Sequence, residues 1–214
     1  MAQIINNNTR PGTDASVITY TPDFNGVNST IDVPHWGPTG DWRISFDYYL
    51  ADAPTTNSTF VSFQNAISNG NYIYIRLSSG STSQVAILGS GVASGSVTNN
   101  AGAVGKNTIK WTCLGTTHTL NLNGTEVSGT VTGLEALTIT RIGYLNGFSL
   151  YLDDLMYNLH LEDLGDPSNS RFYPLSLPST SGAIPGSTTI QDTLSPGNTN
   201  QGTPANFGNW IAKP

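Results

Sequence analysis

Hydrophobic and polar residues alternate with a period of two along most of the chain, which is typical of strands that bury one face. The segment DWRISFDYYL, residues 41–50, shows this most clearly, because Trp42, Ile44, Phe46, Tyr48 and Leu50 share one side. Similar patterns predict strands at 16–21, 29–33, 59–64, 72–78, 84–88, 106–114 and 118–122. We find no convincing helix pattern, so the sequence predicts an all-β fold with little or no helix.

The longest strand pattern covers Ala136–Asp163 and changes phase once. Leu150 and Leu152 share one parity, whereas the next apolar set has the other: Leu155, Tyr157, Leu159 and Leu161. An extra residue at Asp153-Asp154, forming a β-bulge, would let both sets face one core. We therefore expect Leu152 and Leu155 to face the same core. Asn146-Gly147, just upstream, predicts a tight turn before this strand.

The composition favours one β-sandwich domain over residues 1–214. Charged residues make up 10% of the 214 residues, and 23 Gly and 12 Pro separate the short apolar runs. The segment 164–214 is rich in Pro, Gly and Ser, so we expect a tail that wraps or extends the sandwich and adds an edge strand. The uncharged segment Gly89–Gly105 predicts a mobile loop or a poorly specified edge.

Charge and cysteine content argue against several classes of protein. The net charge is −6 with 8 Lys and Arg and no basic cluster, so we expect no nucleic-acid binding. Cys113 is the single cysteine and cannot form an internal disulfide; we expect it in the core. The first residues lack a basic, apolar leader, and no run of about 18 apolar residues occurs, so we expect neither a cleaved signal nor membrane insertion.

Three residues are candidates for a binding surface. Pro34 and Pro38 stiffen a predicted loop that would hold Trp36 near the surface as a platform for a sugar ring. The alternative, which we favour, is that Trp36 covers one end of the core. Tyr144 and Asn146 would supply a second ring and an amide.

A further aromatic pair lies on one predicted strand. Tyr72, Tyr74 and Arg76 share one face of this strand, and the two tyrosine rings and the guanidinium could stack on a flat ligand. Cross-strand aromatic pairs are also ordinary sheet stabilisers, and we favour that role.

No catalytic or metal constellation emerges from the sequence. His35, His118 and His160 are isolated, and the glutamates Glu126, Glu135 and Glu162 lie far apart. Asp153 and Asp154 could bind calcium, but adjacent side chains on an extended strand usually diverge, so we prefer the bulge. We predict no catalytic residue, no metal and no cofactor.

Two motifs resemble a known fold family. The hairpin THTLNLNGTEV, residues 117–127, and the segment LDDLMYNLHL, residues 152–161, resemble strands of concanavalin A-like, laminin G-like jelly rolls. DWRISFDYYL occupies the place of the early core strand in that family. The resemblance covers Asp41–Asp163 and implies an antiparallel two-sheet jelly-roll sandwich. The tail from Arg171 to Trp210, including DTLSPGNTNQGTPANFGNW, is similar to segments that follow such domains in bacteriophage structural proteins.

Together these resemblances imply a non-enzymatic bacteriophage virion surface protein, either a capsid decoration or a tail-associated module. It would assemble in the host cytoplasm as a homo-oligomer, contact other virion proteins and bind cell-surface glycans weakly. The first alternative is a free-standing, lectin-like carbohydrate-binding module. The second is a glycoside hydrolase of the same fold, which needs two carboxylates at close separation.

Overall fold

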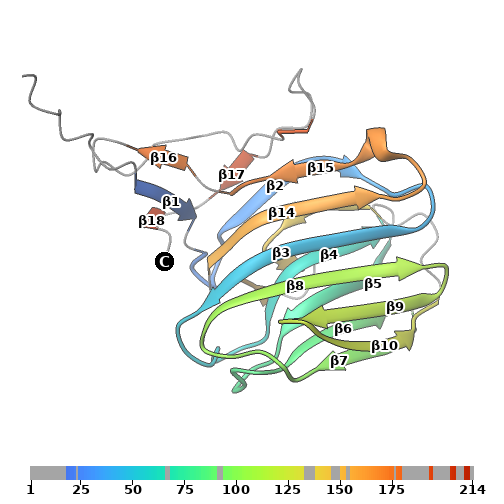
Figure 1. Ribbon diagram of the computed structural model, residues 1–214, viewed down its shortest axis with the longest axis horizontal. Helices are drawn as coiled ribbons and strands as arrows, with labels where there is room; N and C mark the ends of the chain where they lie inside the picture. The colour runs from blue at the N-terminus through green and yellow to red at the C-terminus, as the bar shows by residue number, and fades with distance from the viewer. Residues whose placement is uncertain are drawn as a thin grey trace, which may run out of the picture.

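Two antiparallel β-sheets pack face to face in the computed structural model (Figure 1). The predicted all-β sandwich is therefore confirmed. In the part of the chain that the structure describes, the one helical element is the short 3-10 helix η1, Pro167–Asn169. The described residues are 18–22, 24–65, 68–90, 94–132, 138–145, 150–152, 155–175, 177–179, 193–194, 203–205 and 210–212.

The sheet nearer the viewer in Figure 1 has six strands. Their order is β10 (Thr125–Thr130), β9 (Thr117–Leu122), β8 (Gly105–Leu114), β3 (Trp42–Leu50), β14 (Leu155–Asp163) and β15 (Arg171–Tyr173). The β9–β10 hairpin turns at Asn123 and Gly124, both with positive φ, as the Asn-Gly dipeptide predicts.

The second sheet has seven strands and lies behind the first. Their order is β17 (Thr203–Ala205), β2 (Thr30–Trp36), β11 (Ile139–Ile142), β4 (Ser58–Asn65), β5 (Ser68–Leu77), β6 (Val85–Ser90) and β7 (Ser96–Asn99). Strand β7 falls inside the segment predicted as a loop or weak edge, and it is an edge strand.

Two small sheets complete the fold. One pairs β16 (Leu177–Ser179), β1 (Ile18–Pro22) and β18 (Trp210–Ala212), so both ends of the described chain meet there. The other is a hairpin of β12 (Tyr144–Leu145) and β13 (Leu150–Tyr151).

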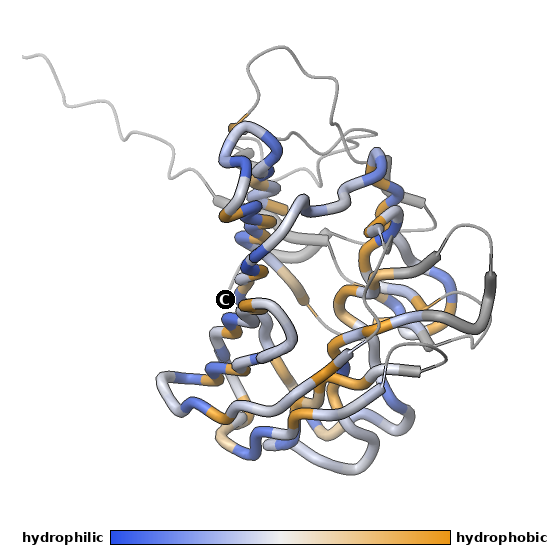
Figure 2. Tube along the Cα trace, turned by 90° about the vertical axis from the view of Figure 1, so that its right-hand side faces the viewer, coloured by the Kyte–Doolittle hydropathy of each residue, from blue (hydrophilic) through white to orange (hydrophobic). Residues whose placement is uncertain are grey.

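The core lies between the two main sheets and is rich in aromatic rings. Buried and half-buried residues alternate strictly along β3, as its period-two pattern predicts. Figure 2 shows the same alternation of hydrophobic and hydrophilic positions along the strands. Trp42 of β3 contacts Phe63 of the opposite sheet and Trp111 of β8, with ring centroids 4.7 Å apart in both pairs. Burial of such large rings supplies much of the hydrophobic stabilisation of a domain of this size.

The phase change of the late strand lies at Asn158. Met156 pairs with Tyr48 and Leu161 pairs with Ile44, and both partners are core residues, so the parity of the core face changes between them. The register shifts between Tyr157 and His160, and Asn158 has a left-handed φ of 55°. This is the geometry of a β-bulge, placed later in the chain than the sequence predicted.

The prediction that Leu155 and Leu152 face one core is wrong. Leu152 belongs to the main core, whereas Leu155 pairs with Tyr49 on the outer face of the six-stranded sheet. Leu155 is nevertheless buried, and strand β1 lies near β14. A buried outer-face residue has the same sequence signature as a core residue, which explains the error. Residues 153 and 154 lie outside the described residues, so a bulge or calcium site there remains untested.

Both sides of the sandwich are closed by contacts between the sheets. On one side β7 lies against β10, and the buried Asn99 side chain donates to the Leu120 carbonyl at 3.0 Å. On the other side Arg171 of β15 donates to the backbone carbonyls of Pro34 at 2.5 Å and His35 at 2.7 Å. Of the predicted loop 34–38, residues 34–36 instead belong to strand β2.

Candidate binding surface

Trp36 lies inside the sandwich. Its ring is fully buried, contacts Phe63 with centroids 5.7 Å apart, and donates its Nε1 hydrogen to the Asn169 carbonyl at 2.8 Å. The prediction of an exposed platform at Trp36 is therefore wrong, because no face of the ring is open to a sugar. The packing matches the favoured alternative, a ring that covers the core.

Tyr144 belongs to the small hairpin, which folds over the outer face of the seven-stranded sheet. The Ser62 hydroxyl of β4 donates to the Tyr144 carbonyl at 3.0 Å, and the Leu145 side chain packs on the outer-face residues Tyr72 and Tyr74 of β5. Leu145 pairs with Leu150, so four residues connect the two strands and the predicted reversal of the chain is present. Asn146 is one of these four and lies outside the described residues.

Tyr144 is part of a compact group that we call the Tyr144 surface, made of Asp32, Arg141, Tyr144 and Tyr151. The two tyrosine rings stack with centroids 4.7 Å apart at an interplanar angle of 30°. The Arg141 guanidinium lies over the Tyr144 ring, 5.3 Å from its centroid. Both rings are half-buried, so this aromatic pair reaches solvent.

An ion pair borders the stacked rings. Arg141 of β11 and Asp32 of β2 face each other in the register of the sheet, and their side chains form a hydrogen-bonded ion pair. The hydrogen bond to Asp32 raises the pKa of the Arg141 guanidinium above its ordinary value. The side chains are 41% and 48% exposed, so both can offer hydrogen bonds to a ligand hydroxyl.

Tyr72 and Tyr74 lie next to this surface, where they pack against Leu145, the neighbour of Tyr144. Their rings lie 5.6 Å apart and are mostly covered by Leu145 and Leu88. Burial raises the pKa of the Tyr74 hydroxyl, and the nearby Arg76 offsets only part of this rise. The favoured stabilising role fits this packing.

The sequence missed three of the four members of the Tyr144 surface. Asn146-Gly147 predicted a two-residue turn, which would have paired Tyr144 with Ser149. The observed loop of four residues brings Tyr151 opposite Tyr144 instead. Arg141 and Asp32 are 109 residues apart, and their contact depends on the pairing of β11 with β2. No local pattern encodes that pairing.

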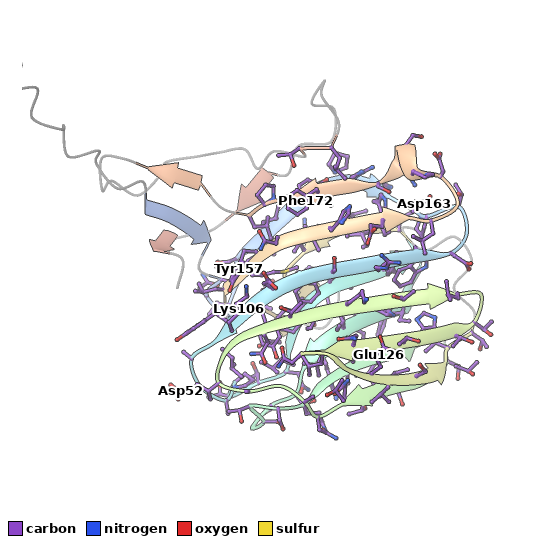
Figure 3. All side chains as sticks on the ribbon, in the orientation of Figure 1. Asp52, Lys106, Glu126, Tyr157, Asp163 and Phe172 are labelled. Carbon is purple, nitrogen blue, oxygen red and sulfur yellow. The ribbon has the colours of Figure 1, made fainter. Side chains whose placement is uncertain are left out.

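Asp163 organises the loops at one end of the six-stranded sheet (Figure 3). Its buried carboxylate accepts hydrogen bonds from the backbone of Thr39, Gly165 and Asp166 and from the Asn169 side chain, at 2.9 to 3.0 Å. Burial alone would raise the pKa of Asp163, but these hydrogen bonds outweigh it and lower the pKa. This satisfied carboxylate is structural.

The two described glutamates are not a catalytic pair. Glu126 lies on β10, where it accepts from Asn121, and Glu162 lies on β14, where it faces Arg43 at 3.4 Å. Three strands separate β10 from β14, so these two strands are about 19 Å apart, given a spacing of about 4.8 Å between neighbours. Glycoside hydrolysis needs a separation of about 5 to 9.5 Å. Glu135 lies outside the described residues.

Comparison with known proteins supports the fold. No protein-family model and no curated protein sequence matches the chain. Among solved structures, domains LG4-5 of the mouse laminin alpha1 chain match with a TM-score of 0.53 at 14% identity, covering 76% of this chain and 46% of that one. The fold is a laminin G-like jelly roll.

A second solved structure matches over more of the chain. A Bacteroides ovatus ATCC 8483 protein, described as a "putative carbohydrate binding protein", matches with a TM-score of 0.59 at 13% identity. The match covers 92% of this chain and 60% of that one. This chain is therefore similar to only part of each structure. Neither structure is a virion protein, so the virion role expected from the sequence stays a prediction.

The described residues contain no group of three or more His, Cys, Asp or Glu side chains placed to hold a metal ion. They also contain no helix that is long and apolar enough to cross a membrane.

Proposed function

We propose that this protein is a carbohydrate-binding jelly-roll module and that it binds glycans at the Tyr144 surface. The observation that carries the proposal is the half-buried Tyr144–Tyr151 stack beside the Arg141–Asp32 ion pair. An aromatic face packs against the C–H face of a sugar ring, and a guanidinium with a carboxylate offers donors and acceptors to hydroxyl groups.

Similarity of fold adds to this argument. The Bacteroides ovatus structure carries carbohydrate binding in its name, and its similarity covers most of this chain. Fold likeness alone does not assign a function, so the proposal rests on the side chains of the Tyr144 surface.

A glycan array with the wild type, Tyr144→Ala and Tyr49→Ala tests the proposal. Tyr49 is a half-buried tyrosine on the outer face of the other sheet and is a matched control. We expect the wild type and Tyr49→Ala to bind the same glycans, and Tyr144→Ala to lose roughly 2- to 13-fold in affinity, since stacking on a ring contributes about 0.5 to 1.5 kcal/mol. Equal binding by all three proteins, or none by any, would refute it.

If Tyr144→Ala melts at a much lower temperature, Arg141→Gln replaces it. That variant removes the guanidinium that borders the stack and leaves both rings in place. The predicted virion role rests on sequence resemblance. The predicted homo-oligomer rests on sheet edges that need protection and on the low apolar content of the loop and the tail, and mass measurement in solution tests it.

A further inference from the structure

The seven-stranded sheet has few charges, and one of them has no carboxylate partner among the residues that the structure describes. Its strands carry three charged residues, namely Asp32, Arg76 and Arg141, with histidine counted as neutral. Arg141 pairs with Asp32. Arg76 forms no salt bridge with any described residue, although the whole chain has a net charge of −6.

The hydrogen-bond donors of Arg76 outnumber the acceptors around them. A guanidinium has five N–H donors. Among the described residues, the Tyr74 hydroxyl forms a hydrogen bond with Arg76. The Arg76 Nε atom is buried and has no hydrogen-bond partner in the described part of the chain. A buried, charged donor without a partner is unfavourable, and a ligand can reach only the exposed part of the half-buried Arg76 side chain.

Two hydroxyls near Arg76 are also buried without a hydrogen-bond partner among the described residues. Thr59 of β4 is paired directly with Arg76 in the sheet. Ser78 comes two residues after Arg76, and its backbone N–H donates to the Gln84 carbonyl. Thr59 Oγ1 and Ser78 Oγ are buried and without a partner among the described residues. Both residues are more than nine-tenths buried. These three side chains, at neighbouring positions of β4 and the end of β5, thus each have a buried polar atom without a partner among the described residues.

This group adjoins the Tyr144 surface. Arg76 follows Tyr74 on the same outer face of β5, about 7 Å further along the strand. Tyr74 pairs with Ser62, and Ser62 bonds to Tyr144. Arg76 itself is half-buried, so part of its side chain reaches solvent on that face. One oligosaccharide could therefore contact both sites.

We infer that Arg76 binds the carboxylate of an acidic sugar, in a glycan whose neighbouring ring lies on the Tyr144 surface. The saccharide nature of this ligand rests on the proposed function. The inference comes from the half-buried Arg76 side chain, which has no carboxylate partner among the described residues, because a guanidinium prefers a planar oxyanion that accepts two parallel hydrogen bonds. A neutral sugar would leave the charge without a counterion.

Nuclear magnetic resonance of the full chain labelled with ¹⁵N-arginine tests this inference. The Arg76 Nε–Hε cross-peak is assigned by its absence in Arg76→Lys. We expect an oligogalacturonide to shift this peak in a saturable manner, whereas the matching neutral galactose oligomer and sodium acetate leave it in place. The Arg43 cross-peak is an internal control, because Arg43 lies on the other sheet and already pairs with Glu162.

Affinity measurements complete the test. Arg76→Lys should weaken binding of the acidic oligomer by at least about tenfold, since charge-assisted hydrogen bonds contribute about 1.5 to 3 kcal/mol, and should leave neutral glycans unaffected. An unmoved Arg76 peak, or one that acetate shifts equally, overturns the inference. If neutral glycans still need Tyr144 in that case, the proposed function stands. If the acidic oligomer shifts the peak but no glycan depends on Tyr144, the proposed function fails instead.

Discussion

At the scale of single residues, burial holds His118 neutral, and its hydrogen bonds fix the position of the ring proton. Trp111 Nε1 donates to His118 Nδ1 at 2.9 Å, so the remaining ring proton lies on Nε2, 3.5 Å from Cys113 Sγ. Cys113 Sγ lies 3.2 Å from the Gly115 carbonyl and can donate to it. Burial lowers the pKa of His118 to about 4 and, more than the nearby Asp41, raises the pKa of Cys113 to about 12. Neither side chain is reactive at neutral pH.

This network predicts loss of stability in acid. The pKa of His118 is about 4 in the folded protein and has its ordinary value of 6.5 in the unfolded chain. As the pH falls, the unfolded chain therefore binds a proton at His118 before the folded protein does. The contribution of His118 to the free energy of unfolding is complete above pH 6.5. It is lost as the pH falls to 4, a decrease on the order of 3 kcal/mol. Urea unfolding at pH 7, 5.5 and 4 measures it. His118→Asn, which keeps an acceptor for Trp111, should lose less over this interval. An equal loss in the variant would exclude His118 as the cause.

At the scale of elements, the two sheets approach closely where β7 meets β10. A Cβ atom on Gly129 would come within 2.9 Å of the Val97 side chain. A Cβ atom on Gly95 would overlap the backbone carbonyl of Thr130, and Gly95 has a φ of 128°. These glycines allow the two edge strands to cover each other, which protects both edges from pairing with other chains.

The close approach at Gly95 predicts a clear difference between two Gly→Ala variants. Gly115 also has a positive φ, 60°, but open space around it. Gly115→Ala should lower the free energy of unfolding by about 1 kcal/mol, from backbone strain alone. Gly95→Ala adds a backbone clash and should cost about 2 to 4 kcal/mol more. Urea unfolding of both variants measures the difference, and equal costs would show that the edges separate easily.

At the scale of the whole molecule, aromatic rings join the sheets into one core. Trp36 and Phe63 come from the seven-stranded sheet, and Trp42 and Trp111 come from the six-stranded sheet. Phe63 contacts all three tryptophans, with ring centroids 4.7 to 5.8 Å apart. Loss of one ring therefore weakens the contact between the sheets.

Trp36→Ala should lower the free energy of unfolding by about 3 to 5 kcal/mol, as large-to-small changes in a packed core do. The folded fraction should bind glycans as the wild type does, because the Tyr144 surface lies on the outer face of the sheet. Thermal melts and a glycan array below the melting temperature measure the two effects. A stable Trp36→Ala protein with lost glycan binding would restore Trp36 as a binding residue.

Much of the fold could be predicted from local chemistry. The alternation along β3 and the Asn123-Gly124 turn both follow from neighbouring residues, since side-chain direction in a strand and the φ of a tight turn are local properties. Of the binding surface, the sequence indicated only Tyr144.

The tertiary structure decided what depends on contacts between distant strands. Leu155 and Leu161 have the same parity and the same apolar character, yet the bulge at Asn158 turns them to opposite faces of the sheet. Arg141 meets Asp32, and Arg76 meets Thr59, only through strand register. The sequence by itself determined which residues are apolar and how they alternate. What covers each face was fixed only by packing, because burial is a property of the assembled sheets.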